Sequence, residues 1–98
     1  MKYEFEGAVH RWTANPAFFL VSLPGNISEE IREISDGLTA GFGSLKVEAR
    51  IGSIVWRTSI FPDSSTGLFD LPIKAEVRKK NNLIEGSLAH VAIEVLGF

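Results

Sequence analysis

The feature that most restricts the fold of this chain is a Leu-Pro step that occurs once in each half. Leu23-Pro24 and Leu71-Pro72 lie 48 residues apart (71 minus 23) in a chain of 98 residues. Each half reads strand, Leu-Pro, helix, strand, and neither half has enough apolar surface for a core of its own. A true repeat therefore predicts two β-α-β units that close into one mainly-β barrel about a pseudo-twofold axis. The helices of the two halves are offset by two residues relative to the Leu-Pro repeat. The alternative is therefore that the repeat is a coincidence.

The strands of such a barrel are predicted by alternation of apolar and polar side chains. Residues 2–10, 45–51, 54–61 and 89–95 alternate with a period of two, which places one face on a core and the other in water. A turn at Gly52-Ser53 is expected to join the second and third of these segments into a hairpin.

The remaining segments predict further strands and loops. Residues 17–23 are apolar on both faces, which is typical of a central strand that is covered on both sides. Residues 11–16 contain Asn-Pro and are expected to form a loop. Residues 61–67 are the longest polar stretch and are expected to form a mobile loop before a short strand over residues 68–71.

Two short helices complete the predicted fold. The first follows Pro24-Gly25, with Asn26 as its N-cap, Glu29 as the capping-box partner and Gly37 at its end. Its core face is expected to carry Ile27, Ile31, Ile34 and Leu38.

The second helix is expected to begin at Pro72, where a missing N–H group costs nothing. Its core side chains are predicted to be Ile73 and Val77. Asn81-Asn82 is expected to end the helix by taking up left-handed backbone geometry.

Composition excludes several classes of protein. The chain contains no cysteine, which excludes disulfides, thiolate chemistry and Cys-based metal sites. Its 10 basic and 12 acidic residues give a formal net charge of −2, so no overall field attracts nucleic acid. No apolar run approaches the roughly 20 residues of a membrane-spanning helix, and the first residues lack the apolar stretch of a signal peptide. We therefore expect a single cytoplasmic domain over residues 1–98, without a cofactor or a membrane partner.

The central and C-terminal segments carry a resemblance to a known family. Residues 43–52, Trp56-Arg57-Thr58-Ser59 with Phe61-Pro62, and the run from Leu71 to Arg78 resemble a bacterial family known only as a domain of unknown function. The resemblance extends over nearly the whole chain. It implies a double-split β-barrel related in architecture to AbrB and MazE proteins, in a family whose members occur alone or fused to a domain associated with bacteriocin protection. It implies no catalytic residues, and Ser87 stands where the family usually has an acidic residue.

The predicted second helix is the most basic part of the chain. Its net charge of +3 comes from Lys74, Glu76, Arg78, Lys79 and Lys80. AbrB-like proteins bind DNA as dimers, so the resemblance implies a phosphate-contacting surface with Lys79 and Lys80 as the nucleic-acid-binding residues. The alternative is the solvated face of a short helix with cations near its C-terminus. Residues 1–49 carry 4 basic and 7 acidic side chains, which argues against a second matching DNA half-site.

Two tryptophans suggest a different kind of site. Trp12 and Trp56 are candidates for the walls of an apolar pocket in which Arg57 or Arg78 would hold an anionic group. The alternative is that Trp56 belongs to the core, because large aromatic side chains dominate core packing. Arg57 lies on the opposite face of its strand from Trp56, which argues against one pocket that uses both. The candidate ligand-binding residues are Arg57, Lys74 and Arg78.

No residue pattern favours catalysis or a metal site. His10 and His90 fall on polar strand faces at spacings that favour surface residues over metal ligands. The sequence lacks a Gly-x-Ser-x-Gly elbow, and Gly41-Phe42-Gly43 is not followed by the Gly-Lys-Ser/Thr of a phosphate-binding loop. We therefore expect a monomeric, non-enzymatic binding module for a small molecule or a protein partner. The alternative is a nucleic-acid-binding regulator of AbrB-like descent, and an enzymatic activity of another kind stays open.

Overall fold

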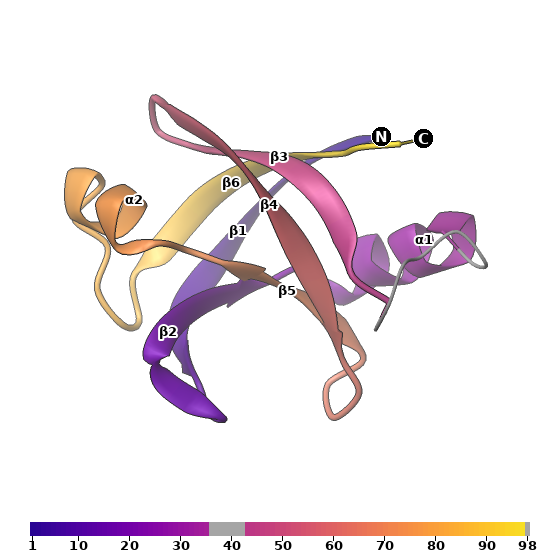
Figure 1. Ribbon diagram of the computed structural model, residues 1–98, viewed down its shortest axis with the longest axis horizontal. Helices are drawn as coiled ribbons and strands as arrows, with labels where there is room; N and C mark the ends of the chain where they lie inside the picture. Colours follow the sequence, from indigo (N-terminus) through magenta and orange to yellow (C-terminus); the bar gives the residue numbers. More distant parts are fainter. Residues whose placement is uncertain (36–42, 98) are drawn as a thin grey trace.

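The computed structural model describes residues 1–35 and 43–97. Over these residues the chain forms a closed six-stranded barrel with two short helices (Figure 1). In chain order the elements are β1 (Lys2–Trp12), β2 (Asn15–Ser22), α1 (Gly25–Ser35), β3 (Leu45–Ile51), β4 (Ile54–Asp63), β5 (Leu68–Pro72), α2 (Ala75–Lys80) and β6 (Leu88–Val95). The predicted fold class, a mainly-β barrel with two short helices, is confirmed.

The strand order is unchanged when the two halves of the chain are exchanged. Around the barrel the order is β1-β2-β5-β4-β3-β6, and each neighbouring pair is antiparallel. Exchanging β1, β2 and β3 with β4, β5 and β6 returns the same set of neighbouring pairs. Each half is a β-β-α-β unit, which adds one strand to the unit expected from the sequence. Closure pairs both edges of every strand within one chain.

The register of two strand pairs marks where the pseudo-twofold axis passes. In the β2–β5 pair Ser22 lies opposite Asp70, and these residues are separated by the same 48 positions as the two Leu-Pro steps. On the far side of the barrel the two other equivalent strands meet, β3 and β6, with Ala49 opposite Ile93. The axis passes through both pairs, so the Leu-Pro repeat is structural and not a coincidence.

The barrel interior is filled by alternate side chains of all six strands. Val9, Val21, Val47, Ile60 and Leu71 are fully buried there. Trp56 is 8% exposed and packs in the same cluster, which confirms the core alternative for this residue. The alternation predicted for residues 2–10, 45–51, 54–61 and 89–95 is therefore confirmed as inward and outward faces of barrel strands.

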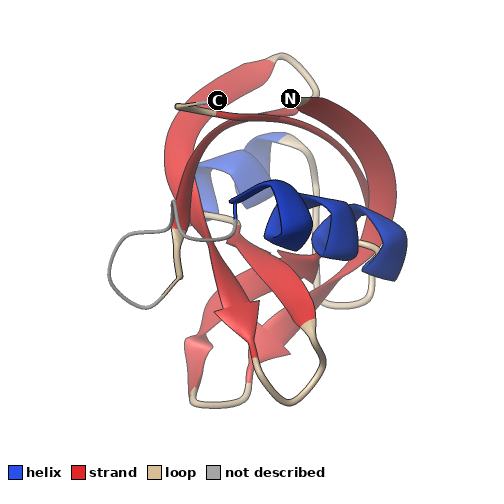
Figure 2. Cartoon of the chain, turned by 90° about the vertical axis from the view of Figure 1, so that its right-hand side faces the viewer, coloured by secondary structure: helices blue, strands red, loops and turns tan. Residues whose placement is uncertain are grey.

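The two helices lie at opposite ends of the barrel (Figures 1 and 2). Each helix contributes one fully buried branched side chain to the core, Ile31 from α1 and Val77 from α2. The helices thus close the two open ends of the strand cylinder, one from each half. No helix in the described part of the chain combines the length and hydropathy needed to cross a membrane.

The start and the buried face of α1 differ from the prediction. The helix begins at Gly25, so Asn26 lies inside its first turn instead of capping it. Ile34 is 45% exposed, and the buried face carries Ser28 and Ser35 instead. Small side chains allow the helix to approach the barrel closely, and the Ser28 hydroxyl donates to the Leu23 carbonyl at 3.2 Å and accepts from the Phe69 N–H at 3.1 Å. The predicted roles of residues 37 and 38 lie outside the described residues.

Two predicted loops and one predicted helix start are instead strand. β1 and β2 run on to a two-residue turn at Thr13-Ala14, and β4 continues to Asp63, so both loops are shorter than expected. The prediction that residues 17–23 form a strand covered on both sides is wrong for its first half, since Phe18 is 53% exposed where the hairpin extends beyond the barrel. Pro72 ends β5 opposite Leu20, because a barrel strand accepts a proline where no ladder donor is required.

The β3–β4 turn and the end of α2 lie against each other. Gly52 has a φ of +61°, as the predicted hairpin turn requires, and Asn82 has a φ of +53°, which confirms the left-handed end of α2. A Cβ atom at Gly52 would overlap Oδ1 of Asn81. Contact between these two turns ties α2 to the β3–β4 hairpin.

Candidate ligand-binding cleft

A cleft lies on the outer face of the barrel where β2 and β5 meet. Its two walls are the β1–β2 hairpin and the β4–β5 hairpin, whose tips both extend on the lower side of the barrel in Figure 1. The cavity volume is about 520 Å³, which falls in the range of roughly 300–1,000 Å³ typical of small-molecule sites. The two hairpins are equivalent elements of the two halves. The repeat that closes the barrel therefore also forms the cleft.

Three large aromatic side chains border the cleft. Trp12 and Phe18 belong to the first hairpin and Phe61 to the second, and their side chains are 44%, 53% and 47% exposed. The Trp12 and Phe18 rings meet edge to face, with centroids 6.2 Å apart. Exposed rings gathered around one cavity are typical of a binding surface, because a soluble protein otherwise keeps such patches small.

The floor of the cleft combines apolar surface with one carboxylate. Leu20, Pro72 and Asp70 point outward from β2 and β5, because they alternate with the inward residues of those strands. Asp70 is only 7% exposed. Its Oδ1 accepts a hydrogen bond of 2.6 Å from the Ser22 hydroxyl, and Oδ2 accepts none from the described residues. Every fully enclosed side-chain oxygen in that part of the chain has a partner, so Oδ2 is not fully enclosed, and Asp70 is one of the residues that line the cleft.

Ser22 connects Asp70 to a histidine. The Ser22 hydroxyl proton goes to Asp70, so the contact of 3.0 Å between Ser22 Oγ and His10 Nε2 has the imidazole as donor. Nδ1 of His10 lies 3.4 Å from the carbonyl oxygen of Arg11. Because a hydroxyl both donates and accepts, Ser22 can pass a proton between the imidazole and the carboxylate.

The two carboxylates of the cleft have opposite pKa shifts. Burial raises the pKa of Asp70, with the Ser22 hydrogen bond opposing this shift and the nearby Asp63 adding to it. Hydrogen bonds from the Ser65 hydroxyl and N–H, of 2.7 and 2.9 Å, lower the pKa of Asp63. The Ser65 hydrogen bonds thus favour the ionised form of Asp63 at the rim of the cleft, whereas burial disfavours the ionised form of Asp70.

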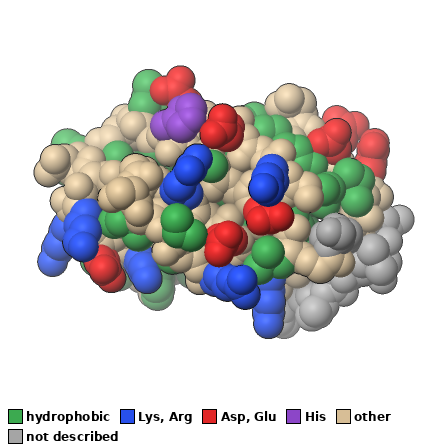
Figure 3. All heavy atoms as spheres, turned by 90° about the horizontal axis from the view of Figure 1, so that it is seen from above, with side chains coloured by type: hydrophobic (Ala, Val, Ile, Leu, Met, Phe, Trp, Pro, Cys, Tyr) green, Lys and Arg blue, Asp and Glu red, His purple; other side chains and the backbone are tan. Residues whose placement is uncertain are grey.

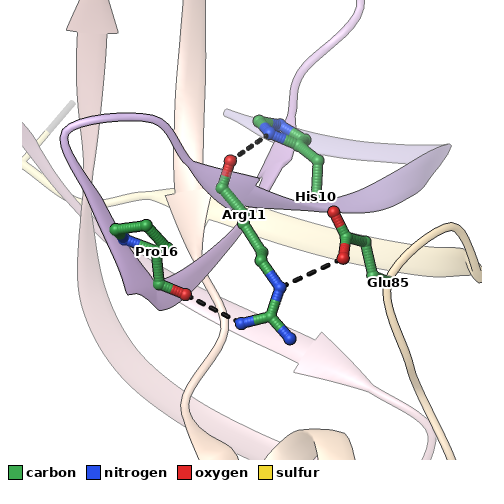
Figure 4. A network of polar contacts seen from close by, with 4 residues as sticks. All are labelled: His10, Arg11, Pro16 and Glu85. Atoms are coloured by element: carbon green, nitrogen blue, oxygen red, sulfur yellow. Dashed lines mark hydrogen bonds and ion pairs between the residues drawn. The ribbon is translucent and has the colours of Figure 1, made fainter.

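The first wall of the cleft is held by Arg11 (Figure 4). The Arg11 guanidinium donates to the Pro16 carbonyl at 2.9 Å, which braces the β1–β2 hairpin, and to Glu85 Oε1 at 3.0 Å, which ties the hairpin to the turn before β6. The same group lies over the Phe19 ring, 4.6 Å from its centroid. Arg11 therefore positions the hairpin that carries Trp12 without lining the cleft itself.

The sequence-predicted ligand residues lie away from this cleft. Arg57 is on the outer face of β4, 3.8 Å from Glu48, with 74% of its side chain exposed. Lys74 precedes the first turn of α2 and makes no side-chain capping bond. The Arg78 guanidinium lies over Phe19 at 3.8 Å from the ring centroid. None of the three lines the cleft, and the structure does not bring them into one cavity. Their role in binding a ligand stays a prediction.

The sequence-predicted nucleic-acid residues are placed on α2. Lys79 and Lys80 are exposed in the last turn of this six-residue helix, at the end of the barrel. Arg78, one residue earlier, is partly buried against Phe19 and is less free to reach a phosphate. The structure thus presents two of the predicted cations to solvent.

The barrel face opposite the cleft carries charges of both signs (Figure 3). The Arg57–Glu48 ion pair lies on this face. A second ion pair joins Arg50 and Glu4, which lie 3.7 Å apart across β6. A shallow hollow of about 580 Å³ runs along this face. Because acids and bases are interspersed and each such exposed pair contributes about 0–1 kcal/mol, this face has the character of a solvated sheet surface.

Sequence reasoning identified one wall of the cleft and missed the rest. Trp12 was a candidate pocket residue and does line the cleft, whereas its predicted companion Trp56 is in the core. Phe61 was missed because it was predicted to end a strand and begin a polar loop, and Asp70 was missed because it was predicted to lie in a short strand before the second helix. The available signal was the repeat itself: Ser22 and Asp70 have the same 48-residue offset as the Leu-Pro steps, which marks them as neighbours on the axis.

Comparison with known proteins identifies the family. A family model described as "Domain of unknown function (DUF1905)" matches residues 5–93. A search of curated proteins gives no significant match. The matched span includes both hairpins, both helices and all residues that line the cleft. Since this span covers well over half of the sequence, the chain belongs to the DUF1905 family of domains of unknown function.

Proposed function

We propose that this chain is a non-enzymatic binding module whose ligand is a small molecule held in the cleft between the two hairpins. The observation that carries the proposal is one cavity of about 520 Å³ that combines three exposed aromatic rings with a nearly buried carboxylate on its floor. Small-molecule sites have this composition, with mostly apolar walls and a few polar groups that fix orientation.

The barrel supports binding by holding the two walls in place. The floor residues Leu20 and Pro72 are paired to each other in the β2–β5 ladder, so they are part of the closed sheet. Arg11 braces the first wall, and the Asp63 carboxylate closes the turn of the second wall through Ser65. A ligand therefore meets a surface that is largely formed beforehand, which lowers the entropy lost on binding.

The two tryptophans provide the experiment that tests this proposal. Trp12 borders the cleft and Trp56 lies in the core, so their indole N–H signals report separately on the site and on the fold. We would titrate the ¹⁵N-labelled chain with a broad library of small molecules and assign the two signals with Trp12→Phe. Ligands of the cleft are expected to shift the Trp12 indole signal and to leave the Trp56 signal in place.

A matched pair of variants controls the result. Phe61→Ala removes one ring of the cleft and is expected to weaken any hit. Val55→Ala removes an apolar side chain of similar exposure (54% against 47%) on the opposite face and is expected to have no effect. A library without any compound that shifts the Trp12 signal would contradict the small-ligand proposal and favour a protein partner.

The nucleic-acid alternative depends on Lys79 and Lys80. Both are exposed on α2, which supports a contact with phosphates. A regulator of AbrB-like descent would bind a fluorescent DNA duplex with an affinity that falls steeply with salt and is lost in Lys79→Glu/Lys80→Glu. Our proposal expects no binding of the duplex even at low salt, and salt-sensitive binding that depends on these lysines would replace it.

We also infer that the chain acts as a single, monomeric domain in the cytoplasm. Barrel closure supports the monomer, because the second half supplies the strand partners that another copy would otherwise provide. The lack of cysteine is compatible with a reducing compartment. Sedimentation equilibrium tests the monomer, and a mass of twice 10.8 kDa would contradict it.

A further inference from the structure

We infer that the cleft takes an organic cation, a protonated amine or amidine on an aromatic or apolar body, with Asp70 as its charge partner. The inference rests on the proposed function and deepens it, since it names the chemical class of the ligand and the residue that selects it. It differs from the expectation that Arg57 or Arg78 holds an anionic group.

The first support is the sign of the charge in the cleft. Its charged lining residues are Asp63 on the rim and Asp70 on the floor, and no lysine or arginine of the described chain lines it. Arg11 is close by, but its guanidinium points to Pro16, Glu85 and the Phe19 ring. An anionic ligand would meet two carboxylates in a partly desolvated cavity, so complementarity favours a cation.

The second support is the state of the Asp70 carboxylate. The residue is buried, yet among the described residues only Oδ1 accepts a hydrogen bond, from Ser22. Oδ2 is not fully enclosed, and Asp70 lines the cleft. A buried carboxylate is costly unless it is paired, and a ligand N–H⁺ group would provide both the charge and the missing donor. The raised pKa of Asp70, caused by burial first and by repulsion from Asp63 among the other contributions, agrees with an anion that lacks a partner.

The third support is the set of rings that line the cleft together with this carboxylate. Trp12, Phe18 and Phe61 border the cleft, with Phe61 opposite Asp70 in the β4–β5 ladder, and a cation over an aromatic face gains energy from the ring quadrupole. The same rings and the apolar floor at Leu20 accommodate the body of the ligand. A carboxylate and aromatic rings in one cleft are the two kinds of group that together recognise an aromatic amine.

The charged groups that face Asp70 all favour weaker binding of the ligand cation in acid. Protonation of Asp70 removes the charge partner. A positive charge on His10, which reaches Asp70 through Ser22, would compete with the ligand cation. Asp63 is held as an anion by Ser65 and acts in the same direction as Asp70. Affinity for an amine that stays protonated is therefore expected to increase from acid toward neutral pH.

A series of three probes with one phenyl body tests the inference. The probes are 2-phenylethylamine as the cation, 2-phenylethanol as the neutral analogue and 3-phenylpropionate as the anion. Each is titrated against the full chain at neutral pH while the Trp12 indole signal is followed. The expected order of affinity is amine, alcohol, acid, with the amine about tenfold or more tighter than the alcohol.

Variants assign the preference to one carboxylate. Asp70→Asn keeps the size of the side chain and an oxygen that accepts from Ser22, and it is expected to weaken the amine about tenfold while the alcohol changes by less than about twofold. Glu94→Gln, which removes a partly exposed carboxylate on the opposite face, is the matched control and is expected to change neither. If Asp70→Asn disturbs the fold, the Trp56 indole signal will move, and Ser22→Ala then serves as the second variant.

Two outcomes would overturn the inference. The first is an amine that binds no tighter than the alcohol, including the case in which neither moves the Trp12 signal. The second is a loss in Asp70→Asn that is equal for amine and alcohol. The proposed function fails separately, only if the whole library leaves the Trp12 signal unchanged. Neutral or anionic hits in the cleft would thus keep the binding module and refute its preference for cations.

Discussion

Replacement of Gly52 by alanine tests how the repeat is held together at the β3–β4 turn. The backbone at Gly52 has a φ of +61°, and an alanine Cβ there would overlap Oδ1 of Asn81. Asn81 is held in place because its Nδ2 donates to the Val77 carbonyl at 3.0 Å and to the Ile51 carbonyl at 3.5 Å. The substitution therefore strains the turn and also displaces the side chain that joins α2 to β3.

The expected cost has two parts. Left-handed geometry costs an alanine about 1–2 kcal/mol relative to glycine. Displacing the Asn81 amide loses up to two hydrogen bonds worth about 1 kcal/mol each, of which the 3.5 Å bond is the weaker. We expect Gly52→Ala to lower the free energy of unfolding by about 3 kcal/mol, a large share of the roughly 5–15 kcal/mol of a domain this size.

Urea denaturation of the wild type and four variants separates these parts. Gly67→Ala is the matched control, because Gly67 has a φ of +75° and nothing within 4 Å of the added Cβ, so only the backbone cost applies. Asn81→Ala and the double variant with Gly52→Ala complete a cycle. The cost of Gly52→Ala should fall to that of Gly67→Ala when Asn81 is absent. A cost of Gly52→Ala equal to that of Gly67→Ala in the wild-type background would refute the reasoning.

Three further predictions concern the cleft and the helix that closes the barrel. The folded-state pKa of Asp70 is raised, so its contribution to stability is present in acid and is lost as pH rises through that pKa. In urea denaturation Asp70→Asn should therefore be more stable than wild type at pH 7 and lose this advantage below about pH 4. An advantage that is largest in acid would contradict the raised pKa of Asp70. Ser28→Ala leaves the buried Phe69 N–H without its acceptor and should lower the free energy of unfolding by about 1–3 kcal/mol, whereas a neutral result would mean that α1 is not joined to β5 through this hydroxyl. Arg11→Ala breaks an exposed ion pair and should cost less than about 1 kcal/mol, yet it should increase ¹⁵N-relaxation mobility at the tip of the β1–β2 hairpin, and an unchanged tip would remove Arg11 from the positioning of the cleft.

Periodicity predicted the barrel because strand alternation is a local property. The inward residues Val9, Val47, Ile60 and Val91 follow directly from a period of two, and the Leu-Pro repeat gives the symmetry that closes the sheet. Gly52 and Asn82 were predictable because each needs a backbone conformation that few residues adopt.

The errors share a physical cause, which is that local signals do not include the partner strand. Pro72 favours a helix start as strongly as a strand end, and only its pairing with Leu20 decides between them. Asn26 is a good capping residue, but the helix starts at Gly25. In this helix the Ser28 hydroxyl bonds to both the Leu23 carbonyl and the Phe69 N–H. Such choices are made by contacts between residues far apart in the chain.

The cleft was largely beyond prediction for the same reason. Its aromatic residues come from two hairpins that are separated by about 50 positions, and each segment alone looks like an apolar strand or a loop. Arg78 and Lys74 drew attention because they cluster in the sequence, while the carboxylate at the cleft floor is a single acid in an apolar strand. A lone polar residue on the outer face of a predicted strand, at the offset of an internal repeat, is the pattern that would have indicated it.

The most direct test of the account is the titration of the Asp70 carboxyl carbon, followed by ¹³C NMR with and without 2-phenylethylamine. A cation bound at Asp70 must favour the ionised carboxylate, so the account predicts that saturating amine lowers the pKa of Asp70 and that 2-phenylethanol does not. Asp63, whose Oδ1 already accepts two hydrogen bonds from Ser65, should shift less. An Asp70 pKa that is unchanged while the amine saturates the Trp12 signal would show that the carboxylate does not hold the ligand, and would contradict the account.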